Sequence, residues 1–195
     1  GSLTINPGSV PSLEMLSSLT TIGGNFQIIH STALTDLDGL SNLTSFGGYL
    51  TVSYNTALED MSGLAGVTEV GMLTIENNPA LTRIGMTGLT AVTERELKIE
   101  SNDSLSNLAG LESLLTVQGY LKLHDNEALE SVSGLDGLNE INGSLNINNN
   151  ALTSISALSS LTTLGSWLYI MHNDALTSLA GLESVVSVYE GIAIA

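Results

Sequence analysis

The stretch GYLKLHDNEALESVSGLDGL, residues 119–138, contains the pattern that decides the fold. Leu121 and Leu123 alternate with polar residues, Asn126 follows five places after Leu121, and Leu129 comes three places after the asparagine. Alternation over so short a run is typical of a strand that buries one face. The segment therefore predicts a short strand, a turn at the asparagine, and a return path that buries its leucines.

The apolar pair of this strand recurs along the whole chain at intervals of 23 or 24 residues. Its members are Leu3/Ile5, Phe26/Ile28, Leu50/Val52, Leu73/Ile75, Leu97/Ile99, Leu121/Leu123, Leu145/Ile147, Leu168/Ile170 and Ile192/Ile194. A recurrence this regular indicates that each strand stacks beside its equivalent in the next turn. We expect a β-rich fold, namely a right-handed leucine-rich β-solenoid with 23–24-residue turns, a parallel sheet, and few or no long helices.

An asparagine column keeps the same period, five residues after each strand opens. It consists of Asn55, Asn78, Asn102, Asn126, Asn150 and Asn173. An inward asparagine at this position can hydrogen-bond backbone groups that the turning chain leaves unpaired. We therefore expect a structural asparagine ladder here rather than a ligand site.

The repeat predicts a single solenoid domain over residues 1–195. Residues 1–25 form a degenerate first turn, in which Pro7, Gly8 and Pro11 stand in place of the usual landmarks, and residues 26–191 form regular turns. Residues 192–195 open a partial ninth strand with no turn after it. Either this strand caps the stack or the chain is cut from a longer protein, and we favour the second interpretation.

Composition excludes several classes of protein. The 20 acidic and 4 basic residues give a formal charge of −16, which repels nucleic acid and anionic membranes. Hydrophobic residues make up 43% of the chain but are interrupted by Gly, Asn and Ser, so direct membrane insertion is not expected. Cysteine is absent, which excludes disulfides and cysteine metal sites without fixing the compartment. We expect a monomer without a cofactor.

The frame of residues 119–138, G-x-L-x-I-x-x-N-x-x-L-x-x-L-x-G-L, resembles the receptor L domain. This resemblance covers essentially the whole chain and implies a secreted or cell-surface module that binds a ligand. Aromatic and histidine side chains at outward strand positions favour a protein or a carbohydrate as that ligand. The receptor versions carry cysteines that this chain lacks, so the sequence is more similar to microbial surface leucine-rich proteins. Receptor signalling is not implied.

Residues that alternate with the buried pairs are expected to face outward, where solenoids commonly bind partners. The candidate ligand-binding residues on this face are Tyr54, Lys98, Lys122, His124, Asp125, Trp167, Tyr169 and His172. Adjacent turns place Glu76 beside Glu100, where a metal ion could bind, although the lysines of the neighbouring column could instead neutralise both carboxylates.

The resulting hypothesis is a non-enzymatic extracellular or cell-surface module for recognition or adhesion. No histidine lies in a nucleophile motif and no glycine-rich loop has the phosphate-binding form, so we do not expect an enzyme. Two alternatives remain open. The chain could be an architectural spacer of a larger surface protein, or an ice-binding module, although the threonine column of Thr51 and Thr74 gives way to Lys98 and Lys122.

Overall fold

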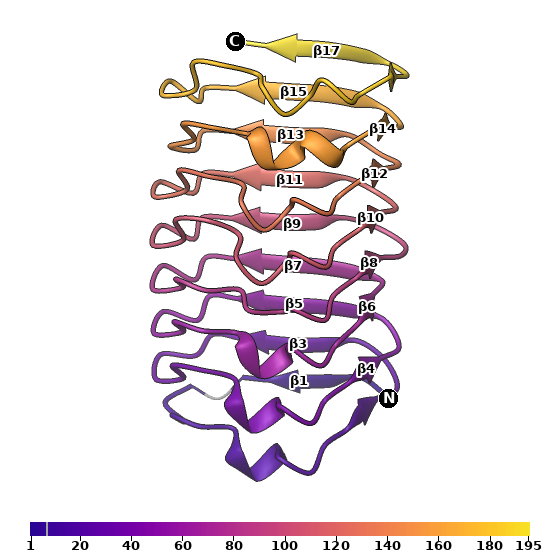
Figure 1. Cartoon of the computed structure of the whole chain (residues 1–195). Coiled ribbons are helices and arrows are strands. Elements are labelled where there is room, and N and C mark those ends of the chain that lie inside the picture. The colour runs from indigo at the N-terminus through magenta and orange to yellow at the C-terminus, as the bar shows by residue number, and fades with distance from the viewer. Residues whose placement is uncertain (7) are drawn as a thin grey trace.

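Nine short strands, one from each turn, form one parallel sheet in chain order (Figure 1). The computed structural model describes residues 1–6 and 8–195, so Pro7 of the first turn lies outside the described residues. The strands are β1 (Leu3–Ile5), β3 (Phe26–Ile29), β5 (Tyr49–Ser53), β7 (Met72–Glu76), β9 (Leu97–Glu100), β11 (Leu121–His124), β13 (Leu145–Asn148), β15 (Trp167–Met171) and β17 (Gly191–Ile194). The last strand begins one residue before the expected partial strand.

The register of this sheet follows the apolar pairs. Leu121 of β11 lies between Leu97 and Leu145, and Leu123 lies between Ile99 and Ile147. Because the side-chain period of a strand is two residues, this register sends every apolar pair to one face. The expected parallel β-solenoid is confirmed.

The opposite side of the solenoid is built from two-residue strands and short 3₁₀ helices. The short strands are β2 (Thr21–Ile22), β4 (Ser45–Phe46), β6 (Glu69–Val70), β8 (Ala91–Val92), β10 (Thr116–Val117), β12 (Glu140–Ile141), β14 (Thr163–Leu164) and β16 (Ser187–Val188). The helices are η1 (Glu14–Leu16), η2 (Asp38–Leu40), η3 (Ser62–Leu64) and η4 (Ser156–Ser160). In the described part the longest is η4, with five residues, which confirms the expected absence of long helices. None of the helices in this part is both long and apolar enough to span a bilayer.

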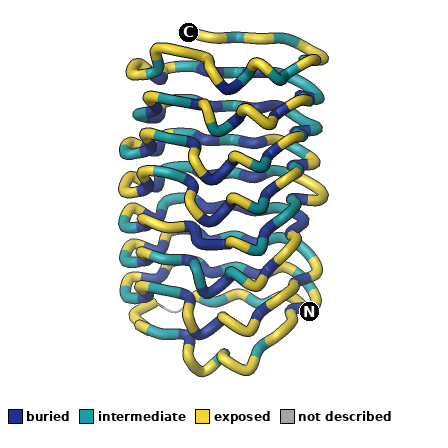
Figure 2. Tube along the Cα trace, in the orientation of Figure 1, coloured by how far each residue is buried: buried dark blue, intermediate teal, exposed yellow. Residues whose placement is uncertain are grey.

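The core runs through the stack between the nine-stranded sheet and this opposite side. Its central leucines, among them Leu97, Leu105, Leu108, Leu111 and Leu114, are fully buried. Figure 2 shows buried and exposed segments repeating from turn to turn. Each turn buries its apolar face mainly against its two neighbours, as expected for a solenoid.

One corner of the repeat requires glycine. Gly110, Gly134 and Gly181 have φ angles of +105°, +106° and +112°, a conformation that other residues rarely adopt. A Cβ atom at Gly110 would also overlap the backbone of Gly85 in the preceding turn. Tight stacking therefore dictates the glycine at this corner.

Candidate functional site

The asparagine column closes the strand ends from inside the solenoid. Asn55, Asn78, Asn102 and Asn126 are fully buried, and Asn150 and Asn173 are 6% and 7% exposed. The Asn102 Oδ1 accepts a hydrogen bond of 3.2 Å from the backbone N–H of Asn78, and the Asn102 Nδ2 donates one of 3.0 Å to the carbonyl of Ile75. The same bonds repeat from turn to turn, so these amides are committed to the backbone.

The residue before each asparagine of the column, and His30 before Ser31 at the equivalent place, adopts a left-handed backbone conformation. Its φ lies between 53° and 58° in every turn that has this corner, at His30, Tyr54, Asn77, Ser101, Asp125, Asn149 and His172. This conformation ends the strand and lets the next residue turn inward. Asn, Asp and His adopt it more readily than other non-glycine residues, whereas a tyrosine there is an outlier.

Tyr54 is 47% exposed and stacks on His30 of the preceding turn, with ring centroids 5.1 Å apart. The fold would be served at least as well by asparagine at this position, as Asn77 and Asn149 show. Tyr54 therefore places an aromatic ring at the edge of the sheet face at a conformational cost of about 1–2 kcal/mol. Backbone strain of this kind clusters at functional sites.

The centre of the sheet face carries a network of ion pairs. The Lys98 Nζ lies 2.6 Å from the Glu76 carboxylate and 3.0 Å from that of Glu100. The ammonium thus occupies the position between the two carboxylates that a metal ion would need. Burial alone lowers the pKa of Lys98, but hydrogen bonds to Glu76 and Glu100 and their Coulombic attraction outweigh it and raise the pKa above 10.5.

Lys122, in the next turn, lies beside Lys98 in the sheet register but has a different partner. Its Nζ is 2.7 Å from the carboxylate of Glu96 and 5.6 Å from the centre of the Tyr120 ring. The two lysines are therefore held apart by separate acidic partners. In residues 1–6 and 8–195, no group of three or more His, Cys, Asp or Glu side chains could hold a metal ion.

His124 and Asp125, at the end of β11, differ in their accessibility. The His124 Nε2 and the Oδ1 of its neighbour Asn148 are buried and have no hydrogen-bond partner among the described residues. Asp125 is exposed and accepts a hydrogen bond of 2.6 Å from the Asn149 side chain. The carboxylate of Asp125 is thus available to a ligand, whereas the Nε2 of His124 is not.

The C-terminal third of the face is aromatic. The rings of Trp167 and Tyr169 in β15 stack with centroids 5.3 Å apart and an interplanar angle of 15°. The Trp167 ring extends over Gly191 of β17, which has no side chain to displace it. His172 is exposed and borders a hollow of about 320 Å³ that Glu127 and Asp174 also line.

The structure thus divides the candidate residues among three places on one face. Tyr54 lies on the N-terminal part with His30, the lysines with His124 and Asp125 lie in the centre, and Trp167, Tyr169 and His172 lie on the C-terminal part. They do not line one common pocket.

The family model of the receptor L domain matches residues 1–111 and 115–191. The chain belongs to the receptor L domain family. Receptor L domains are non-catalytic, ligand-binding domains that are typically extracellular. A comparison with curated proteins finds no match.

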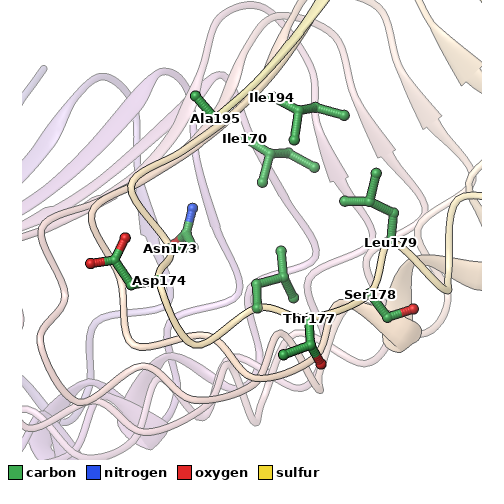
Figure 3. A pocket seen from close by; sticks show the side chains of 9 residues that line it. Ile170, Asn173, Asp174, Thr177, Ser178, Leu179, Ile194 and Ala195 are labelled. Atoms are coloured by element: carbon green, nitrogen blue, oxygen red, sulfur yellow. The ribbon is translucent and has the colours of Figure 1, made fainter.

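A hollow of about 370 Å³ in this receptor L domain lies at the C-terminal end of the stack (Figure 3). Ile170, Leu179 and Ile194 line it together with Asn173 and Asp174. These apolar residues belong to the columns that pack against the following turn elsewhere in the solenoid. The hollow therefore exposes the end of the core and is not a cleft of the sheet face.

Sequence reasoning did not include Arg95, Glu96 and Tyr120 of this receptor L domain among the candidates. All three line a second hollow at the start of the strands, described below. A signal was present, because Arg95 stands where the flanking turns have Gly71 and Gly119. A charged residue in a glycine column indicates a side chain at a corner where the flanking turns have none.

Proposed function

We propose that this receptor L domain is a non-enzymatic recognition module that binds a protein or carbohydrate ligand with the outward face of its nine-stranded sheet. The module acts outside the cell or at its surface. The supporting observation is Tyr54, an exposed tyrosine kept in a left-handed conformation that favours asparagine.

The chemistry of the face is consistent with this role. Tyr, Trp and Arg are enriched at interfaces, where rigid side chains lose little entropy on binding. The stacked pairs His30–Tyr54 and Trp167–Tyr169 already hold their rings in fixed geometry. The ion pairs around Lys98 similarly fix the centre of the face. Such a surface recognises its ligand by shape and polar complementarity with little reorganisation.

The test is a binding screen against a glycan array and a cell-surface protein extract, run with calcium and with a chelator. Wild type is compared with Tyr54→Asn, with Tyr169→Ala/His172→Ala, and with the control Leu115→Ala. Leu115 is 45% exposed and directly precedes β10, away from the nine-stranded sheet. Binding that either face variant loses and the control retains supports the proposal. Failure of wild type to bind under any condition overturns it in favour of an architectural spacer, and equal loss in the control overturns the assignment to this face.

A further inference from the structure

A cleft of about 360 Å³ lies at the start of the strands, next to the central ion pairs of the sheet face. Its lining consists of Met72, Glu94, Arg95, Glu96, Gly119 and Tyr120, and we name it the Arg95 cleft. Met72 is the first residue of β7, Glu96 directly precedes β9, and Tyr120 directly precedes β11. It is thus built from three successive turns.

The glycine column makes room for Arg95. A side chain at Gly119 would overlap the backbone carbonyl of Arg95, and a side chain at Gly71 would crowd Tyr49 and Glu94. Because Gly71 has none, the Arg95 side chain reaches past that turn and lies 5.4 Å from the centre of the Tyr49 ring. Stacking on a ring orients a guanidinium while leaving its N–H groups free to donate.

Arg95 differs from the other basic residues in its partners. Lys98 is bound by Glu76 and Glu100, Lys122 by Glu96, and Arg83 lies 3.8 Å from Asp60. For Arg95 no carboxylate of the described residues lies within ion-pair distance, and its side chain is exposed. Its immediate neighbour Glu96 is already neutralised by Lys122. The guanidinium is thus available for an anion from outside the chain.

The other lining residues restrict which chemical group can be attached to that anion. Met72 and the ring of Tyr120, which is 49% exposed, give the cleft an apolar and aromatic wall. A planar guanidinium binds a carboxylate through two parallel hydrogen bonds, and an adjacent aromatic wall favours a flat apolar group.

We propose that the Arg95 cleft binds a carboxylate joined to an aromatic or bulky apolar group, as presented by an acidic-aromatic segment of a protein ligand. This inference rests on the proposed function, and it names a subsite and a ligand class for the same face. Arg95 donates to the carboxylate, while Met72 and Tyr120 contact the apolar group. Glu94 opposes binding by its charge.

The test uses N-acetylphenylalanine as the probe and follows the ¹H–¹⁵N spectrum of the protein. We expect saturable shifts at the Gly119 and Met72 amides and at the Arg95 Nε–H, with millimolar affinity. N-acetylphenylalaninamide, which lacks the carboxylate, and N-acetylglycine, which lacks the ring, should each bind about tenfold more weakly, a difference of about 1.4 kcal/mol. Glu94→Gln should tighten binding of the probe.

Arg95→Gln is the decisive variant and Arg83→Gln is its matched control, since both remove a guanidinium from an exposed residue. Loss of the shifts in Arg95→Gln alone supports the inference. Equal binding of acid and amide, equal loss in the control, or no saturable shift in wild type overturns it. If wild type binds a ligand in the glycan and protein screen but does not bind N-acetylphenylalanine, the Arg95 cleft is rejected as a subsite. The proposed function is then unaffected.

Discussion

Replacing Asn102 by alanine removes one rung from the middle of the asparagine ladder. The side chain is fully buried, and its hydrogen bonds reach both adjoining turns, including one of 3.4 Å that its Nδ2 donates to the Asn126 Oδ1. Its Oδ1 accepts the backbone N–H of Asn78 at 3.2 Å, and its Nδ2 donates to the carbonyls of Ile75 and Glu100, each at 3.0 Å. Alanine offers no replacement for any of these bonds.

The expected loss of stability follows from the groups that the variant leaves behind. The Asn78 N–H becomes a buried donor without a partner, which costs about 1–3 kcal/mol. The carbonyls of Ile75 and Glu100 each lose an accepted bond, which adds about 1 kcal/mol in total. We therefore expect the free energy of unfolding to fall by about 3 kcal/mol, a large part of the roughly 5–15 kcal/mol typical of a domain.

The assay is equilibrium urea unfolding followed by circular dichroism, with Asn42→Ala as the control. Asn42 is exposed, although its Nδ2 also donates a hydrogen bond, of 2.7 Å, to the backbone carbonyl of Ser17. The control should lose less than about 0.5 kcal/mol because water replaces its bond. Hydrogen exchange at the Asn78 amide should accelerate in Asn102→Ala only. An equal and small loss in both variants would refute the ladder as a source of stability.

Three further outcomes are expected. Tyr54→Asn should raise the free energy of unfolding by about 1 kcal/mol in urea unfolding because it relieves left-handed strain, while Tyr54→Phe leaves it unchanged; a less stable Tyr54→Asn would remove the argument from strain. Lys98→Met should be less stable than wild type below pH 10.5, and this difference in the free energy of unfolding should vanish as pH rises through the raised pKa of Lys98. A stability difference that persists in urea unfolding at alkaline pH would show that packing, not charge, is responsible. Gly110→Ala should lower the midpoint of thermal unfolding far more than Gly8→Ala, because only the first overlaps a neighbouring backbone; equal midpoints would contradict the close stacking of this corner.

Much of the architecture could be predicted from the sequence because the same pattern of apolar residues, asparagine and glycine recurs in successive turns. The pairs such as Leu97/Ile99 define strand, register and buried face together, and the structure pairs them in that register. The asparagine column likewise follows from spacing alone, since a buried polar residue at a fixed place in each turn must bond the strand-end backbone and the equivalent residue of the next turn. Absence of long helices followed from the short distance between glycine corners.

The binding face was less predictable because it depends on side-chain geometry that does not repeat. Spacing placed Glu76 and Glu100 side by side but left open whether a metal ion or a lysine lies between them; the 2.6 Å contact shows Lys98 there. Tyr54 could be placed on the face, but its left-handed backbone could not be inferred from alternation. The stacking of Arg95 on Tyr49 spans two turns and depends on the missing side chain of Gly71. Such contacts are properties of particular turns and not of the repeat.

Site-specific photocrosslinking measures most directly whether the sheet face is the ligand-binding surface. A photoreactive phenylalanine derivative replaces Asn146, which lies beside Tyr169 in the sheet, or Leu115 on the opposite side as the control. The proposed function predicts a saturable crosslink between position 146 and the ligand. Unlabelled wild type should compete this crosslink away, whereas unlabelled Tyr169→Ala/His172→Ala should not. A stronger crosslink from position 115, or equal competition by the double variant, would contradict it.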